Sequence, residues 1–164
     1  MSKTYIRVDD RLIHGQIAVA WAQTLSIGEI IAIDDQTANN KMLQQIMLMG
    51  VSKNYNPSII SFSQSEEVLN KETSLNRLVI VRSPEQLELI IPFIKNLEMV
   101  YLGNIQKTPE SKYNMSSGAG GVLFFSQRDI DAISRLDEKG IKFVLQMVPS
   151  SGSRTWEQAK KTFK

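Results

Sequence analysis

The chain has 164 residues, 42% of them hydrophobic and 22% charged, which is typical of one globular domain. It has no cysteine and one histidine, so disulfides, thiolate catalysis, cysteine-based zinc sites and multi-histidine metal sites within one chain are excluded. A net charge of +2, with no basic run longer than two lysines, does not favour nucleic-acid binding. Because there is no 18-residue apolar stretch and no signal-peptide core at the start, we expect a cytoplasmic protein.

Strand-like and helix-like segments alternate along the chain. Seven short apolar runs predict strands at residues 5–8, 29–33, 58–62, 77–81, 97–102, 121–125 and 141–148. The stretches between them predict helices at residues 14–25, 38–49, 64–71, 84–95 and 127–139. Near-continuous apolar strands indicate a sheet buried on both faces. We therefore expect a single-domain α/β fold, with an open, mostly parallel twisted sheet of about seven strands and helices on both faces.

Several helix ends carry recognisable signals. Ser83 followed by Pro84 is a capping residue with a proline in the first turn, and Gly140 is a typical C-terminal glycine for the helix 127–139. The tail 153–164 predicts a last surface helix. One face of that helix would carry Trp156, Ala159 and Phe163.

The loop "DDRLIHG", residues 9–15, follows the first predicted strand and contains the only histidine, His14. Sites in open α/β sheets form at the C-terminal ends of strands, so this loop is the first place to look for function. The sequence contains neither the GxGxxG dinucleotide motif nor a P-loop. We therefore expect no NAD or ATP site of those kinds and no cofactor.

The residues around His14 suit a phosphoryl group. At the start of the helix 14–25, the backbone N–H groups of Gly15, Gln16 and Ile17 would be free, and the helix dipole favours an anion. Arg11 adds a planar guanidinium that matches phosphate oxygens. An imidazole in these surroundings can carry a phosphoryl group without a metal ion. A structural role for the lone histidine is the alternative.

Other polar residues near the strand ends have two interpretations each. Asp9 or Asp10 could hold the tautomer of the imidazole or orient Arg11, which could equally be a simple ion pair. Asp34 and Asp35, after the second predicted strand, could cap a helix or line the site. The glycine-rich stretch 118–121 could be an anion-binding nest, although a flexible connector is favoured. For Lys107 we favour a solvated side chain over a charge near the site.

The segment "RVDDRLIHGQIAVAW" resembles the opening of the IIB component of the mannose/fructose/sorbose family of the bacterial sugar phosphotransferase system. The similarity extends to "IIAIDDQTANN", "LVIVRSPEQLELII" and "DIDAISRLDEKGIKFVLQMVP", and so covers most of the chain. Residues 103–121 depart from the pattern of the family.

The resemblance implies a phosphoryl relay. His14 matches the phosphorylated histidine of the family, which accepts phosphate on Nδ1 from a phosphohistidine of a IIA protein. It then passes the phosphate to a sugar that enters through the membrane partners IIC and IID. Arg11 matches the loop arginine, and Gly15 and Gln16 continue the motif. The resemblance also implies a homodimer that associates with the inner face of the membrane through IIC and IID. From their positions at the strand ends, Asp9, Asp10 and Asp35 are expected to be orienting residues.

Two other classes of protein share this pattern of elements. A receiver-type signalling domain requires an acceptor aspartate after its third strand, and "SIISFSQSEE" has none. A non-catalytic interaction or signalling module of the same fold class remains possible, because such sheets host many functions. Incubation with a phosphohistidine donor, followed by measurement of the intact mass, separates this module from the relay.

Overall fold

The structure is a computed structural model that describes residues 2–163. Its strands are β1 (Thr4–Asp9), β2 (Ile27–Ile33), β3 (Ser58–Ile60), β4 (Asn76–Val81), β5 (Leu97–Asn104), β6 (Ser111–Gly118), β7 (Gly121–Ser126), β8 (Phe143–Leu145) and β9 (Arg154–Thr155). Its α-helices are α1 (Gly15–Thr24), α2 (Asp35–Ala38), α3 (Lys41–Met49), α4 (Ser65–Asn70), α5 (Leu87–Ile90), α6 (Gln127–Glu138) and α7 (Trp156–Lys160). Short 3₁₀ helices are η1 (Lys53–Tyr55), η2 (Phe62–Gln64), η3 (Pro84–Gln86) and η4 (Ile91–Phe93).

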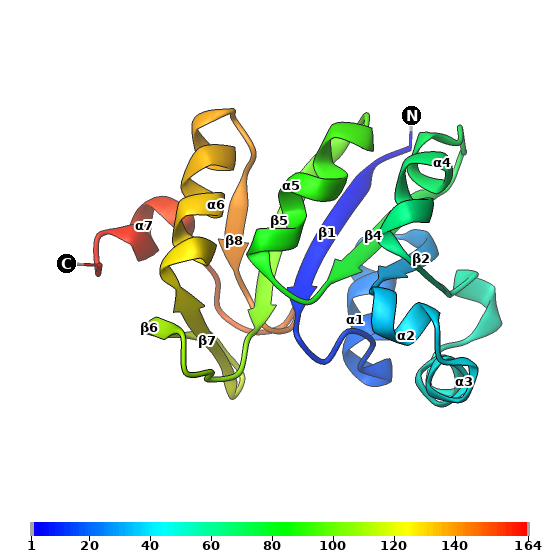
Figure 1. Cartoon of the computed structure of the whole chain (residues 1–164), viewed down its shortest axis with the longest axis horizontal. Coiled ribbons are helices and arrows are strands. Elements are labelled where there is room, and N and C mark those ends of the chain that lie inside the picture. The colour runs from blue at the N-terminus through cyan, green and yellow to red at the C-terminus, as the bar shows by residue number, and fades with distance from the viewer. Residues whose placement is uncertain (1, 164) are drawn as a thin grey trace.

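The main sheet has seven strands in the order β3-β2-β4-β1-β5-β8-β9 (Figure 1). The strand pairs are parallel, except that β9 runs antiparallel to β8. The expected α/β class and the mostly parallel sheet are therefore confirmed. None of the helices formed by residues 2–163 is long and apolar enough to cross a membrane.

Helices cover both faces of the sheet, as the continuously apolar strands predict. One core cluster contains buried side chains from α4, α5, α6 and α7, and the other contains those of α1 (Figure 1). On the central strand β1, Ile6 and Val8 face the first cluster, whereas Tyr5 packs against the second. β1 lies between β4 and β5, so the loop that follows it leaves the sheet near the middle of its C-terminal edge.

Residues 121–125 form a strand as expected, within β7, but their expected place in the main sheet is wrong. β7 pairs antiparallel with β6 in a separate two-stranded sheet, and the seventh strand of the main sheet is β9. The polar residues of β6 hide its strand character in the sequence. The stretch 118–121 is the turn of this hairpin rather than a flexible connector, and Ala119 and Gly120 have φ values of +50° and +80°. Positive φ at both central residues is typical of the tightest hairpin turns.

Three other boundaries differ from the expected ones. The predicted helix 38–49 begins only at Lys41, as α3, because the Asn40 side chain caps it by accepting a hydrogen bond of 3.0 Å from the Leu43 N–H, and residue 38 ends the separate short helix α2. The predicted helix 84–95 is a short α5 between two 3₁₀ helices, and Pro92 lies in the second of them. The predicted strand 141–148 is regular only in β8.

The capping signals agree with the structure. The Ser83 N–H donates to the Gln86 side chain at 3.3 Å, and Gly140 follows α6 with a φ of +92°. The tail forms β9 and then α7. Trp156 and Ala159 are buried there, and the Phe163 ring packs 5.5 Å from the Trp156 ring, so the shared face is confirmed. Residue 164 lies outside the described part of the chain.

Candidate functional site

His14 lies at the C-terminal edge of the sheet, between β1 and α1. It is the N-cap residue of α1, with extended backbone angles (φ −108°, ψ 105°), and its exposed side chain makes no capping hydrogen bond. The first helical bond runs from the Ala18 N–H to the His14 carbonyl at 2.9 Å. The N–H groups of Gly15, Gln16 and Ile17 precede that bond, so they have no acceptor within the helix.

The loop that carries His14 is held by buried apolar side chains. Leu12 and Ile13 are both buried in the core cluster on the α1 side of the sheet, together with Trp21. Leu12 has a φ of +63°, a left-handed conformation that costs a leucine on the order of 1–3 kcal/mol. Burial of its side chain offsets this strain and fixes the direction in which the chain enters α1.

Gly15 gives α1 its close approach to α3. A Cβ built on Gly15 would lie 2.6 Å from the carbonyl oxygen of Gly50, which directly follows α3. The obstructing atom belongs to the backbone, so it cannot move aside as a flexible side chain would. Gly15 therefore fixes the distance between the start of α1 and the end of α3.

We expect Gly15→Ala to lower the free energy of unfolding by about 1–3 kcal/mol, because relief of the clash requires the two helices to separate. Urea unfolding measures the change. The control is Gly152→Ala, where the added Cβ meets no atom within 4 Å and we expect a change within about 0.5 kcal/mol. Equal stabilities of the two variants would contradict the close approach of α1 to α3.

Asp9 holds Arg11 rather than His14. Its Oδ1 accepts hydrogen bonds from the Arg11 backbone N–H and Nε, both at 3.0 Å, and its Oδ2 accepts one from Arg11 Nη2 at 2.9 Å. The hydrogen bond to Asp9 raises the pKa of Arg11. This bidentate contact leaves Nη1 of Arg11 without a hydrogen bond within residues 2–163, on a side chain that is 33% exposed. Arg11 therefore forms an ion pair with Asp9 through one edge of its guanidinium, and the other edge is available to a ligand.

A second arginine, the buried Arg7, also contacts Asp9. Arg7 on β1 is 2% exposed, and its Nη2 donates to Asp9 Oδ2 at 2.9 Å. Its guanidinium lies 5.9 Å from the Trp21 ring, and its Nη1 has no partner in the described part of the chain. Burial lowers the pKa of Arg7, whereas the ion pair with Asp9 opposes this effect. The Asp9 carboxylate thus pairs with two guanidinium groups, and the charge of Asp10 in the same loop also acts on Arg11.

Asp10 ties the loop to the end of β5. Its Oδ1 accepts from Asn104 Nδ2 at 3.1 Å, and its Oδ2 accepts from the Gln106 N–H at 2.6 Å. Arg82, at the end of β4, donates from Nη1 to the Asp10 carbonyl. The side chain of Asp10 therefore positions the loop and makes no hydrogen bond to His14.

Asp34 and Asp35 follow β2 and make hydrogen bonds to segments next to its end. Asp34 caps α2, since its Oδ2 accepts from the Thr37 N–H at 3.1 Å and from Thr37 Oγ1 at 2.6 Å, and its Oδ1 pairs with Arg82 Nε at 3.1 Å. Burial alone would raise the pKa of Asp34, but the hydrogen bonds from Thr37 and Arg82 outweigh it and lower the pKa. Asp35 Oδ1 accepts from the Phe62 N–H at 2.8 Å, so this carboxylate is directed at β3 rather than at His14.

Sequence reasoning did not identify Arg82 as part of the site. Its guanidinium joins the loop after β1 to α2, because it contacts Asp10 in the loop and both Asp34 and, at 3.3 Å, Thr37 Oγ1 at α2. The position of Arg82 directly after β4 could have identified it, since β4 is a neighbour of β1 and the C-terminal ends of parallel strands meet at one edge. Lys107 is exposed and makes no ion pair within residues 2–163, as the solvated interpretation predicts.

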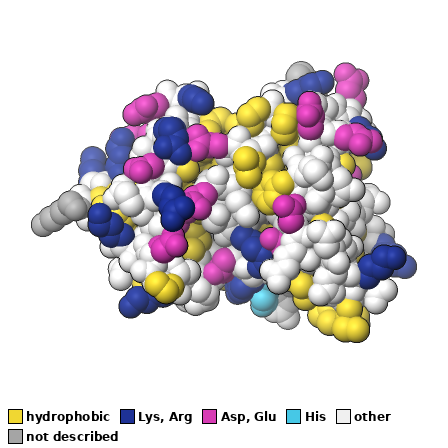
Figure 2. Space-filling model, in the orientation of Figure 1, with side chains coloured by type: hydrophobic (Ala, Val, Ile, Leu, Met, Phe, Trp, Pro, Cys, Tyr) yellow, Lys and Arg dark blue, Asp and Glu magenta, His cyan; other side chains and the backbone are white. Residues whose placement is uncertain are grey.

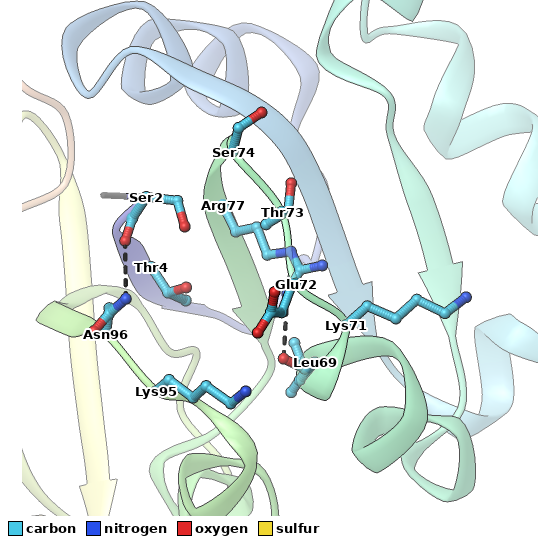
Figure 3. A pocket seen from close by; sticks show the side chains of 10 residues that line it. All are labelled: Ser2, Thr4, Leu69, Lys71, Glu72, Thr73, Ser74, Arg77, Lys95 and Asn96. Carbon is cyan, nitrogen blue, oxygen red and sulfur yellow. Dashed lines mark hydrogen bonds between the residues drawn. The ribbon is translucent and has the colours of Figure 1, made fainter.

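Two cavities formed by residues 2–163 do not have His14 in their lining. One of about 260 Å³ lies beside Asp10 and Arg82. Another of about 580 Å³ lies at the opposite edge of the sheet, where side chains from the starts of β1 and β4, among them Thr4 and Arg77, surround it (Figure 3). Within residues 2–163, no group of three His, Asp or Glu side chains is placed to hold a metal ion. An exposed imidazole that lines neither cavity suits reaction with a macromolecule better than capture of a small ligand in a pocket.

The fold and the site define a small α/β protein whose single histidine projects from the strand–helix junction at the centre of the sheet edge. Residues 3–163 match the family model for the sorbose subfamily IIB component of the phosphotransferase system. The chain therefore belongs to the sorbose subfamily of IIB components of this system.

Relatives and solved structures agree with this family. The chain is 24% identical over 160 residues to the fructose-specific EIIB component of Bacillus subtilis, covering 96% of this chain and 95% of the relative. It is 33% identical over 110 residues to a probable phosphotransferase enzyme IIB component of Streptococcus pyogenes, covering 66% and 68%. The IIBSor domain of the sorbose permease from Klebsiella pneumoniae has the same fold, with a TM-score of 0.84 at 21% identity, over 99% of this chain and 98% of the other.

Proposed function

We propose that this protein is a phosphoryl carrier in sugar uptake. His14 accepts a phosphoryl group from a phosphohistidine of a IIA protein and transfers it to a sugar that enters through the membrane components IIC and IID. The observation that carries this proposal is the exposed, hydrogen-bond-free imidazole at the N-terminus of α1, in a chain of the IIB family. The protein acts in the cytoplasm as a homodimer and associates with the inner face of the membrane through IIC and IID.

The relay consists of two substitutions at phosphorus. In the first, the lone pair of His14 Nδ1 forms a P–N bond while the P–N bond of the donor phosphohistidine breaks and the donor imidazole leaves. In the second, a sugar hydroxyl oxygen forms a P–O bond and gives up its proton, the P–N bond to His14 breaks, and the released imidazole takes up one proton. Each step moves the same phosphoryl group, so neither an oxidant nor a metal ion is needed for the balance of atoms.

The surroundings of His14 favour the phosphorylated state. The N–H groups of Gly15 and Gln16 and the positive end of the α1 dipole lie on the side of the imidazole that faces the helix. The free Nη1 of Arg11 can donate to a phosphoryl oxygen while Asp9 holds the other edge of the guanidinium. Asp10 and Arg82 hold the loop so that these groups stay in place. Asp35 has no part in this arrangement.

The test is phosphorylation by the general phosphotransferase enzymes together with candidate IIA proteins. We expect the intact mass to rise by one phosphoryl group, the adduct to be lost in acid, and peptide mapping to place it on His14. A IIA protein that is itself phosphorylated under these conditions serves as the positive control. If none of a representative panel of phosphorylated IIA proteins transfers its phosphate, the chain is a non-catalytic interaction module.

We expect Arg11→Lys to slow phosphoryl transfer about ten- to a hundredfold, because the lysine keeps the charge and loses the planar guanidinium. One charge-assisted contact is worth roughly 1.5–3 kcal/mol, which corresponds to that change in rate. Rapid-quench measurement of transfer from a phosphorylated IIA protein gives the rate.

The matched control for this prediction is Arg135→Lys. Arg135 makes the same kind of bidentate contact, to Glu88 at 3.0 and 2.7 Å, on the exposed surface of α6. We expect the wild-type rate in that variant. A wild-type rate in Arg11→Lys as well would mean that Arg11 is only an ion-pair partner of Asp9.

A further inference from the structure

We propose that an apolar ridge on α3, formed by Met42, Ile46 and Met49, is the surface on which the phosphodonor IIA protein docks. This inference rests on the proposed function and adds a location for the partner. The three side chains are 73%, 61% and 83% exposed, and their i, i+4, i+7 spacing places them on one face of the helix. Figure 2 shows hydrophobic side chains over α3, on the same rim of the molecule as the single histidine.

The fold does not require this ridge. The opposite face of α3 carries Met47 and Leu48, which are partly buried against the core cluster on the α1 side of the sheet. The ridge side chains instead face solvent, where three large apolar groups on nine residues serve no packing role. Clustered exposed apolar side chains of this kind mark interaction surfaces, whereas isolated ones do not.

The position of α3 places the ridge within the footprint of any protein that reaches His14. α3 ends against the start of α1, because Gly50 meets Gly15. A nine-residue helix is about 13 Å long. A partner that buries about 800 Å² on each side covers a radius of about 15 Å around the point of transfer. Direct transfer between two histidines must place that point at His14, so the donor covers at least the end of the ridge that carries Met49.

The chemistry of the surface fits a donor that binds briefly. Lys41, at the other end of α3, is exposed and makes no ion pair within residues 2–163, and the partly exposed Arg11 belongs to the same loop as His14. The donor brings a phosphoryl dianion, so positive charges flanking an apolar patch complement it. Methionine side chains adapt to a partner surface without a fixed fit. Obligate homodimers bury roughly 2,000–5,000 Å² in total through largely apolar interfaces, which is far more apolar surface than three side chains supply, so the ridge favours a transient partner over a second copy of this chain.

The test compares a protein donor with a chemical one. The ridge variant is Ile46→Ser/Met49→Ser, and the control is Leu89→Ser on α5, because Leu89 is 57% exposed on the opposite face of the sheet. Each variant is phosphorylated by the IIA protein that phosphorylates the wild-type chain in the test described under the proposed function. Separately, each is phosphorylated by phosphoramidate, a small donor that needs no docking. We expect the ridge variant to lower kcat/KM for the IIA protein about tenfold or more and to leave the phosphoramidate rate unchanged. The control should change neither.

Other outcomes overturn the inference, and they differ from failure of the proposed function. Wild-type transfer from the IIA protein in the ridge variant would mean that the donor docks elsewhere, although His14 remains the carrier. Loss of a homodimer in sedimentation, or loss of sugar phosphorylation in IIC/IID vesicles with normal uptake from IIA, would assign the ridge to a second copy or to the membrane partner. If neither donor phosphorylates the wild-type chain at His14, the proposed function itself fails.

Discussion

His14→Ala is expected to accept no phosphate from a IIA protein and to support no sugar phosphorylation. The chain has no second histidine that could replace it. The free energy of unfolding should stay within about 0.5 kcal/mol of the wild-type value, because the imidazole is exposed and makes no capping hydrogen bond. Intact mass after incubation with the donor measures the first effect, and urea unfolding measures the second.

The control for His14→Ala is Gln23→Ala, which removes an exposed side chain from the far end of the same helix. We expect normal phosphorylation in that variant. Retained transfer in His14→Ala would rule out the relay, whereas a large loss of stability would mean that the histidine has a structural role.

The second large effect concerns the buried carboxylate beneath the loop. Asp9→Leu is expected to lower the free energy of unfolding by about 3–5 kcal/mol, because it leaves the guanidinium of Arg7 buried without its charged partner. The same change frees the guanidinium of Arg11, so phosphoryl transfer should also fall in whatever fraction of the protein folds. Urea unfolding at neutral pH, combined with the transfer assay, measures both.

The double variant Arg7→Met/Asp9→Leu separates the cost of an unpaired charge from the cost of altered packing. Replacement of both members of a buried ion pair by apolar residues is often close to neutral, so we expect the double variant to recover most of the lost stability. It should not recover the transfer rate, since Arg11 still lacks its anchor. A loss of less than about 1 kcal/mol in Asp9→Leu would mean that water reaches Arg7 easily.

Local patterns in the sequence were sufficient for the class of fold and for the position of His14. Apolar runs and capping residues depend on neighbours a few positions away, so the strand β1, the helix α1 and the loop between them could all be predicted. The same holds for Gly140 after α6 and for the shared face of Trp156 and Ala159. The position of His14 could be predicted because sites in open α/β sheets form at the C-terminal ends of the strands, and His14 follows the first strand.

Features that depend on distant residues could not be predicted in this way. The polar strand β6 is stabilised by pairing with β7, so its own residues do not reveal it, and residues 121–125 were assigned to the wrong sheet. The division between α2 and α3 depends on a single capping asparagine within a pattern that otherwise looks continuous.

Local signals in the sequence alone determined that this protein adopts an α/β fold and that its one histidine lies at a strand–helix junction. Only the tertiary structure decided which groups surround that histidine. Arg82 reaches the loop from β4 and Asn104 reaches it from β5, and Asp9 turns to Arg7 and Arg11 rather than to the imidazole. These contacts join strand ends that are up to about a hundred residues apart, and the order of strands in the sheet brings them together. That order is set by the packing of the whole core, which no short stretch of sequence encodes.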